Sequence, residues 1–171
     1  ISEDKIFRYF NNQIFVITAN LVGEQRYGSL INGRIFLIEK ELGLSYIDQN
    51  NIIKLPHSGR FDKNYGRYVI LPFKKNKLLI ATQDKGLFLY DLEMISHKGI
   101  IFPDNTETNT AFTITQSFKT SITKYLEMHG LYSACLVDSN LFALGTITGG
   151  IVLIDDKGAL VQIINKEKEL R

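Results

Sequence analysis

The apolar residues of this chain come in short runs that are separated by turn-forming residues. Residues 78–81 and 141–144 are continuous apolar runs that are too short for helices, and each leads through a threonine into a turn. Such runs are typical of strands that are covered on both faces, as the inner strands of stacked sheets are. A membrane-spanning helix needs roughly 18 to 20 apolar residues, so we expect no membrane span in this chain.

Two of these runs belong to a segment that occurs twice. Residues 76–91 align with residues 140–155 without a gap, at an offset of 64 (140 minus 76). The aligned pairs include Gly66 and Gly130, Tyr68 and Tyr132, Thr82 and Thr146, Gly86 and Gly150, and Asp91 and Asp155. In both segments a tight turn that contains glycine joins the apolar run to a run rich in aromatic and β-branched residues. The repeat therefore predicts the same β-hairpin in two places.

The second copy extends into a complete unit of four strands. We expect these strands at 132–137, 141–146, 150–155 and 160–164. The last turn, at Asp156, Lys157 and Gly158, has the composition of a tight connection between antiparallel strands. Four short antiparallel strands make one blade of a β-propeller.

A weaker third copy begins at 12–18. Asn12 and Thr18 lie 64 residues before Asn76 and Thr82, and the alignment gives a common core of about 53 residues, near the roughly 40 to 50 residues of a propeller blade. We therefore predict an all-β fold of β-propeller-type repeats, with about three four-stranded antiparallel blades in an incomplete ring. The expected units are 12–67, 68–131 and 132–171, within a single repeat domain that covers 1–171.

One segment departs from the strand pattern. In residues 120–129 the apolar and aromatic residues recur at helical spacing, with Ser121 at the position of an N-cap and Gly130 at that of a C-terminal cap. We expect one short helix there, in a connection between blades. The preceding stretch, 103–110, is polar and rich in turn-forming residues, which predicts a mobile surface loop.

Three blades cannot close a ring that needs four to eight. The chain also opens at Ile1 without a basic and apolar leader. We therefore expect it to be a fragment of a larger propeller. The alternative is that two or more copies form a homo-oligomer through the open blade faces, because an open stack leaves apolar faces at both ends.

Composition indicates a folded chain without a nucleic-acid surface. The sequence has 171 residues, 44% of them hydrophobic, and a net charge of +2, which excludes intrinsic disorder. Lys74, Lys75 and Lys77 form the one tight basic group and are interpreted as a solvated hairpin tip. Nucleic-acid binding requires a basic stripe interleaved with exposed aromatic residues. The sequence lacks that pattern, and we expect no nucleic acid to contact this segment.

The sequence offers little chemistry. His57, His97 and His129 lie far apart, and none has a second ligand at the spacing of a metal site. Asp155 and Asp156 are explained by the turn they enter. We therefore expect no metal, no cofactor and no enzymatic activity; a propeller hydrolase or lyase, with acids, histidine or tyrosine converging on the channel, is the alternative that stays open.

The single cysteine is predicted to be structural. Cys135 stands between Ala134 and Leu136, which favours a buried small hydrophobic residue over a reactive thiol.

Propellers bind ligands on the face where the loops between second and third strands lie beside the connections between blades. In this chain those loops contain Asp84, Lys85 and Thr148. We take these three residues as the candidate ligand-binding residues. The alternative is that they are ordinary solvated turn residues.

Residues 132–170 resemble the regulator-propeller repeats of bacterial two-component and related sensor proteins, which are abundant in Bacteroidetes. The resemblance is closest over 132–170, weaker over 68–91 and weakest over 13–55. The family has a tryptophan before its Gly-Thr pair, where this chain has Ala143 and Leu144 before Gly145 and Thr146. Only the fold and the broad role are therefore transferred.

The resemblance implies a non-enzymatic, ligand-sensing propeller segment of a bacterial signalling protein. It implies a periplasmic location, as the extracytoplasmic part of a membrane sensor, and a small-molecule or carbohydrate ligand. The alternative function is a protein–protein interaction scaffold that self-associates or docks a partner through its blade faces.

Overall fold

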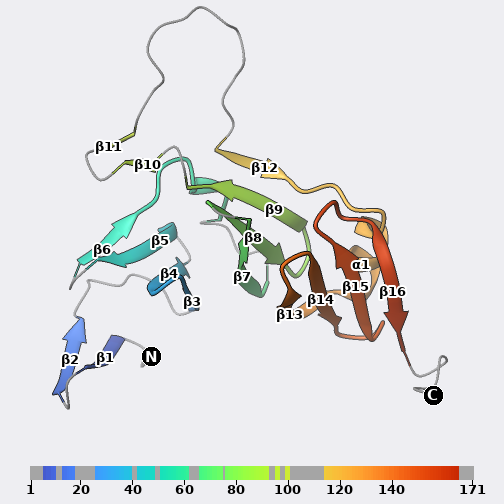
Figure 1. Cartoon of the computed structure of the whole chain (residues 1–171), viewed down its shortest axis with the longest axis horizontal. Helices are drawn as coiled ribbons and strands as arrows, with labels where there is room; N and C mark the ends of the chain where they lie inside the picture. The colour runs from blue at the N-terminus through green and yellow to red at the C-terminus, as the bar shows by residue number, and fades with distance from the viewer. Residues whose placement is uncertain are drawn as a thin grey trace, which may run out of the picture. The chain divides into compact units, whose positions relative to one another are not determined.

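The structure is a computed structural model that describes residues 6–10, 13–17, 26–39, 42–48, 51–61, 66–74, 76–92, 95–96, 99–100 and 114–165. The chain divides into two compact units, residues 1–64 and 65–171. Both are built from short antiparallel strands (Figure 1). Each unit is described below by itself.

The first unit holds a hairpin and a four-stranded sheet. The hairpin pairs β1 (Ile6–Phe10) with β2 (Gln13–Ile17). The sheet runs in chain order through β3 (Arg26–Ile31), β4 (Arg34–Glu39), β5 (Gly43–Asp48) and β6 (Asn51–Lys54), and a 3-10 turn follows at Gly59–Phe61. Asn32 and Gly33 join β3 to β4 with φ values of 49° and 75°, the left-handed conformation that makes Asn-Gly the preferred two-residue hairpin turn.

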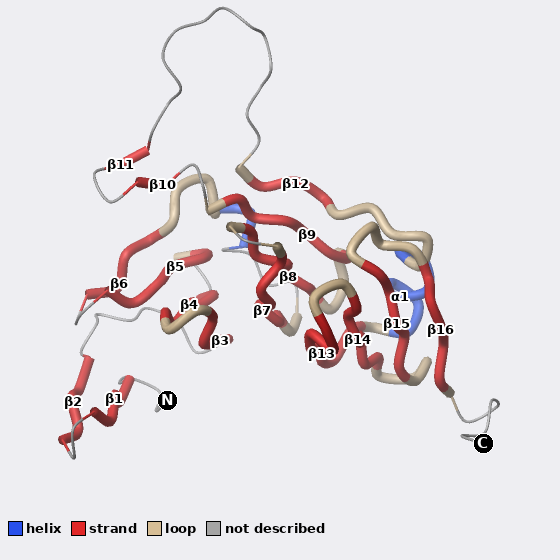
Figure 2. The backbone as a smooth tube through the Cα atoms, in the orientation of Figure 1, coloured by secondary structure: helices blue, strands red, loops and turns tan. Residues whose placement is uncertain are grey.

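In its described residues, the second unit holds two four-stranded sheets and one helix (Figure 2). The first of these sheets contains β7 (Tyr68–Phe73), β8 (Lys77–Thr82), β9 (Gly86–Asp91) and β12 (Thr115–Ser117), and the short strands β10 (Ile95–Ser96) and β11 (Gly99–Ile100) pair with each other. The helix α1 (Thr123–His129) precedes the second sheet, which contains β13 (Leu131–Asp138), β14 (Leu141–Thr146), β15 (Ile151–Asp155) and β16 (Leu160–Ile164). In both sheets the strands lie in chain order.

One core joins the two sheets and the helix of the second unit. Leu79 and Ala81 of β8, Phe142 and Leu144 of β14, and Leu126 of α1 are all buried in the same apolar cluster. Alternate residues of a strand point to opposite faces, so each sheet contributes one face to this core. The phenyl rings of Phe73 and Phe142 stack across it with centroids 5.7 Å apart.

The predicted fold class is confirmed. The described part of the chain is mostly β, with three four-stranded antiparallel sheets and one helix, and none of the sheets closes into a barrel. This arrangement matches incomplete propeller-like blades. The four strands expected between residues 132 and 164 are present as β13 to β16, with ends that differ by at most one residue.

The register of the two sheets in the second unit confirms the offset of 64. Ile70, Ile80 and Phe88 lie side by side across β7, β8 and β9. The residues 64 positions later form the corresponding row across β13, β14 and β15: Ala134, Leu144 and Val152. The repeat in the sequence therefore gives both sheets the same strands and also the same pairs of neighbouring residues across those strands.

The sheet of the first unit is separated from the next sheet by fewer residues than the sequence repeat predicted. In it, Glu39 pairs with Gly43 at the end of β4, as Thr82 pairs with Gly86 at the end of β8. Glu39 lies 43 residues before Thr82, which is shorter than the core of about 53 residues inferred from the sequence. Strand β2 pairs with β1 and is not part of this sheet; the alignment of 12–18 with 76–82 therefore stays a prediction. In the first sheet, Glu39 stands at the position where the other two sheets have Thr82 and Thr146.

The predicted helix is present, but its predicted N-cap is wrong. Ile122 occupies the N-cap position, without a side-chain capping hydrogen bond. The Ser121 hydroxyl oxygen instead accepts a hydrogen bond from the backbone N–H of Leu160 at 3.0 Å. Gly130 does end the helix, at φ 60°, and its N–H donates to the carbonyl oxygen of Leu126. The expected loop at 103–110 lies outside the described residues.

The predicted burial of Cys135 is also wrong, because this cysteine is exposed. Ala134 lies opposite Leu144 and contacts the core, whereas Cys135 lies opposite Ala143 on the other face of the sheet. Sequence neighbours on a strand point to opposite faces. The apolar residues on either side of Cys135 therefore say nothing about the face on which it lies.

Candidate functional site

The turns between the second and third strands of the two sheets in the second unit are closed in the same way. The Thr82 hydroxyl accepts a hydrogen bond from the Lys85 N–H at 3.0 Å and donates to the Gly86 carbonyl oxygen at 2.9 Å. Thr146 makes the equivalent bonds, from the Gly149 N–H at 2.8 Å and to the Gly150 carbonyl oxygen at 2.9 Å. The threonine hydroxyl of the repeat thus satisfies a backbone N–H of the turn and adds a second hydrogen bond to the glycine carbonyl, which in the third sheet already accepts one from the Thr146 N–H.

The turn after β14 is held against the C-terminal end of α1. The Tyr125 hydroxyl donates a hydrogen bond to the Gly149 carbonyl oxygen at 2.7 Å. His129 Nδ1 lies 2.8 Å from the Thr148 hydroxyl oxygen, and the rings of Tyr125 and His129 have centroids 4.3 Å apart. The backbone N–H of Ile147 donates to the Gly130 carbonyl oxygen at 2.8 Å. These contacts fix the position of Thr148.

The turn after β8 reaches the same end of the helix. The backbone N–H of Leu131 donates to the Gln83 carbonyl oxygen at 3.3 Å. A Cβ added to Gly130 would lie 3.0 Å from Ile147 Cδ1 and 3.9 Å from Gln83 Cγ. Gly130 therefore lies between the two turns, and its lack of a side chain lets them approach each other.

The structure brings together the turns that carry the predicted ligand-binding residues. Asp84 and Lys85 are exposed on the turn after β8, and Thr148 is exposed on the turn after β14. Thr148 differs from the other two because its hydroxyl is already paired with His129. Whether the three residues bind a ligand stays a prediction.

Sequence analysis missed two residues beside these turns. The guanidinium carbon of Arg67 lies 4.3 Å from the centroid of the Tyr132 ring, a cation–π contact. Arg67 is joined to the first turn, because its backbone N–H donates to Gln83 Oε1 at 3.2 Å and its carbonyl oxygen accepts from the Gln83 N–H at 2.9 Å. Tyr132 is 53% exposed. The pair adds a cation and an aromatic ring to the surface.

A β-bulge explains why Tyr132 is exposed. The alignment pairs it with Tyr68, which is buried and lies opposite Thr82. In the third sheet Leu131 lies opposite Thr146, and the register shifts between Leu131 and Ser133. Tyr132 is the extra residue of this bulge, and such a residue is turned out of the ladder. We call the surface formed by Arg67, Asp84, Lys85, Tyr132 and Thr148 the candidate site.

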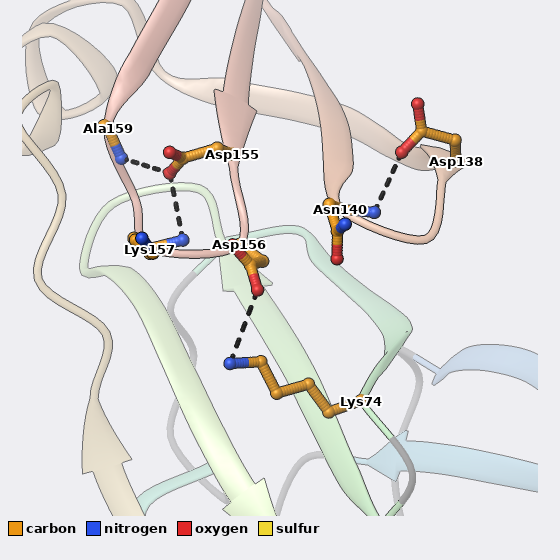
Figure 3. Close-up of polar contacts among 7 residues, drawn as sticks. All are labelled: Lys74, Asp138, Asn140, Asp155, Asp156, Lys157 and Ala159. Atoms are coloured by element: carbon orange, nitrogen blue, oxygen red, sulfur yellow. Dashed lines mark hydrogen bonds and ion pairs between the residues drawn. The ribbon is translucent and has the colours of Figure 1, made fainter.

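The acidic residues of the third sheet stabilise turns. Asp155 Oδ1 accepts hydrogen bonds from the N–H groups of Lys157 and Ala159 at 2.9 and 2.8 Å, and Asp138 Oδ1 accepts one from the Asn140 N–H at 2.8 Å (Figure 3). Asp156 forms an ion pair with Lys74, with Oδ2 and Nζ 3.4 Å apart. The interpretation of Asp155 as a turn residue is confirmed.

The candidate site can form hydrogen bonds, ion pairs and ring contacts with a polar ligand. Among the described residues, no cluster of three or more histidine, cysteine, aspartate or glutamate side chains could hold a metal ion. In the same part of the chain, no helix has the length and apolar character that crossing a membrane requires.

The chain was compared with protein-family models and with curated proteins. The chain matches no model of a known protein family. The search of curated proteins also finds no match.

Proposed function

We propose that this chain is a non-enzymatic, ligand-sensing segment of a bacterial signalling protein, located in the periplasm, and that its ligand binds at the candidate site. The main support for this proposal is that the turn after β8 and the equivalent turn after β14 both lie against Gly130. Binding residues in repeat proteins gather where equivalent loops converge on a rigid scaffold. The resemblance of residues 132–170 to sensor propeller repeats supports the same role.

The side chains of the candidate site favour a small polar ligand such as a carbohydrate. Tyr132 offers an exposed ring on which an apolar sugar face can pack. Arg67 lies against this ring, and Asp84 and Lys85 add exposed charged hydrogen-bonding groups on the neighbouring turn. A few polar groups around an apolar anchor are the usual composition of a small-molecule site.

The test is a thermal-shift screen of mono- and oligosaccharides and other small polar molecules, followed by titration calorimetry of each hit. We expect Tyr132→Ala to weaken binding of a hit by at least tenfold, and the double change Asp84→Ala with Lys85→Ala to weaken it further. Lys157→Ala is the matched control, because Lys157 is an exposed lysine in a turn of the third sheet outside the candidate site. A screen without any hit, or hits that these variants leave unchanged, would contradict the proposal.

A second candidate function is an interaction scaffold. The observation that favours it is a set of large apolar side chains on the third sheet that are 38 to 56% exposed: Tyr132, Leu136, Val137, Ile151, Leu160 and Val161. These side chains do not all share a face: Leu136 and Leu160 lie in the cross-strand row of Phe142 and Ile154, and Ile151 lies on the opposite face. Exposed apolar side chains that gather into a patch are a mark of protein–protein contact. Light scattering over a range of protein concentrations tests self-association, and a constant monomer mass would count against it.

A further inference from the structure

The fold of the repeat does not by itself require a cation where Arg67 stands. The residue 64 positions later is Leu131, which is fully buried, whereas Arg67 is exposed. The next pair differs in the opposite sense, because Tyr68 is buried and Tyr132 is 53% exposed. The candidate site thus combines the exposed member of each of two repeat pairs, and these two residues are in contact.

The guanidinium group of Arg67 is held by an aromatic ring and not by a carboxylate. Its carbon atom lies 4.3 Å from the centroid of the Tyr132 ring. Among the described residues, the N–H groups of this side chain form neither an ion pair nor a hydrogen bond. A guanidinium that stacks on a ring keeps the planar edge that carries its donors. These donors are therefore available to a ligand.

The backbone of Arg67 is fixed on both sides by Gln83. The Arg67 N–H donates to Gln83 Oε1 at 3.2 Å, and the Arg67 carbonyl oxygen accepts from the Gln83 N–H at 2.9 Å. The preceding Gly66 has a φ of 71°, and a Cβ there would lie 2.8 Å from Gln83 Cδ. Glycine thus leaves room for the Gln83 side chain. Because Arg67 is positioned before a ligand arrives, less conformational entropy is lost on binding.

The candidate site has an excess of positive charge. Lys85 lies two residues after Gln83 and is exposed, as is its neighbour Asp84. Within the described part of the chain, no ion pair joins Asp84 to Lys85 or to Arg67. Two cations and one carboxylate leave the site with a net positive charge, which attracts an anion. The Asp84 carboxylate can accept hydrogen bonds from hydroxyl groups of the same ligand.

We propose that the ligand of the candidate site is a sugar acid and that Arg67 binds its carboxylate group through two parallel hydrogen bonds. This inference rests on the proposed function and narrows the class of its ligand. Arginine and carboxylate form such bidentate pairs because the planar donors of the one match the two oxygen atoms of the other. Tyr132, which is 53% exposed even with Arg67 against it, offers a surface for the sugar ring.

The test compares neutral sugars with the acids derived from them, using the full 171-residue chain. Glucose is paired with glucuronate and galactose with galacturonate, so that the two members of a pair differ only in a hydroxymethyl or a carboxylate group. Acetate supplies the carboxylate without the sugar. Titration calorimetry measures the affinity of each probe at low and at high salt concentration.

We expect at least one of the acids to bind about tenfold more tightly than its neutral partner, because a charge-assisted pair is added to the contacts of the sugar. The difference should shrink at high salt. Arg67→Gln should abolish it, and Arg67→Lys should restore only part of it, because an ammonium group lacks the planar donors of arginine. Circular dichroism checks that each variant is folded.

Lys157→Gln is the matched control for the loss of a positive charge. Lys157 is exposed, and it follows β15, whereas Thr148 of the candidate site precedes that strand. The two residues therefore lie beyond opposite ends of β15. We expect this substitution to change the affinity for either acid by less than about twofold.

Four results would overturn the inference. Neutral sugars that bind as tightly as their acids overturn it and leave the proposed sensing function standing. A preference for the acids that persists in Arg67→Gln overturns the role of Arg67. Acetate that binds as tightly as the acids shows that the sugar contributes nothing, which overturns the ligand class. If no sugar and no acid binds, the inference is wrong, and the proposed function then depends on the wider screen of small polar molecules.

Discussion

The Tyr125 hydroxyl donates a hydrogen bond of 2.7 Å to the Gly149 carbonyl oxygen, which lies 24 residues further along the chain. This bond joins the helix between the two sheets of the second unit to the turn between the second and third strands of the third sheet. Because the same turn carries Thr148, the helix holds part of the candidate site in place. The geometry of that site therefore depends on a contact outside it.

We expect Tyr125→Phe to lower the free energy of unfolding by about 1 to 2 kcal/mol, because it leaves the buried Gly149 carbonyl oxygen without this donor. Urea denaturation measures the change. Tyr132→Phe is the control, since Tyr132 is 53% exposed, and it should change stability by less than about 0.5 kcal/mol. Equal effects of the two substitutions would show that the Tyr125 bond does not stabilise the turn.

The hydroxyl of the repeated threonine should stabilise the folded protein at both Thr82 and Thr146. Thr82→Val and Thr146→Val each remove one bond accepted from the turn and one donated to it, and we expect each to cost about 1 to 3 kcal/mol of stability. Thr82 is buried and Thr146 is half-buried, so the loss at Thr82 should be the larger. Serine retains the hydroxyl, and Thr146→Ser should recover most of the loss in thermal unfolding. A valine variant as stable as the wild type would contradict the role of the hydroxyl.

Alanine substitutions at two glycines distinguish the cost of backbone strain from the cost of steric overlap. Gly33 and Gly150 have φ values of 75° and 82°, so alanine at either position should cost about 1 to 2 kcal/mol. A Cβ at Gly33 meets no atom within 4 Å, whereas one at Gly150 would overlap the carbonyl oxygen of Ile164. Gly150→Ala should therefore lower the melting temperature clearly more than Gly33→Ala. Equal losses would mean that strand β16 moves aside without cost.

Stability should fall at alkaline pH because of Tyr90. Burial raises the pKa of its hydroxyl well above the ordinary value near 10, so the folded state keeps a proton that the unfolded state releases. The stabilising contribution is complete below pH 10 and is lost as the pH rises above it, by up to about 1.4 kcal/mol per pH unit. Urea denaturation between pH 8 and 11 should show a shallower fall for Tyr90→Phe. Parallel profiles of the two proteins would exclude this cause.

The strands of the third sheet were predictable from local patterns alone. Short apolar runs such as 141–144 cannot form stable helices, and glycine at Gly150 and Gly158 takes the positive φ that the flanking tight turns require. The same reasoning placed Asp84, Lys85 and Thr148 on the turns that meet at Gly130. Local sequence therefore determined the elements and the order of the strands in this sheet.

Local patterns could not determine which residues each element buries. Cys135 was predicted to be buried from its apolar neighbours, and this was wrong because the alternation of the strand decides the face. A bulge likewise exposes Tyr132, although the aligned Tyr68 is buried. The equivalence of the β3–β6 sheet to the other two was not visible in the sequence, because Glu39 stands where the other sheets have threonine. Only the pairing of β4 with β5 reveals it.

The sequence by itself determined an all-β repeat fold with one helix, because the period of the apolar residues and the turn chemistry are local properties. Only the tertiary structure decided the contact of Arg67 with Tyr132 and the meeting of two distant turns at Gly130. Both depend on how one sheet is set against the next. That arrangement follows from the packing of residues far apart in sequence, since a one-residue shift in register changes the face on which every later side chain lies.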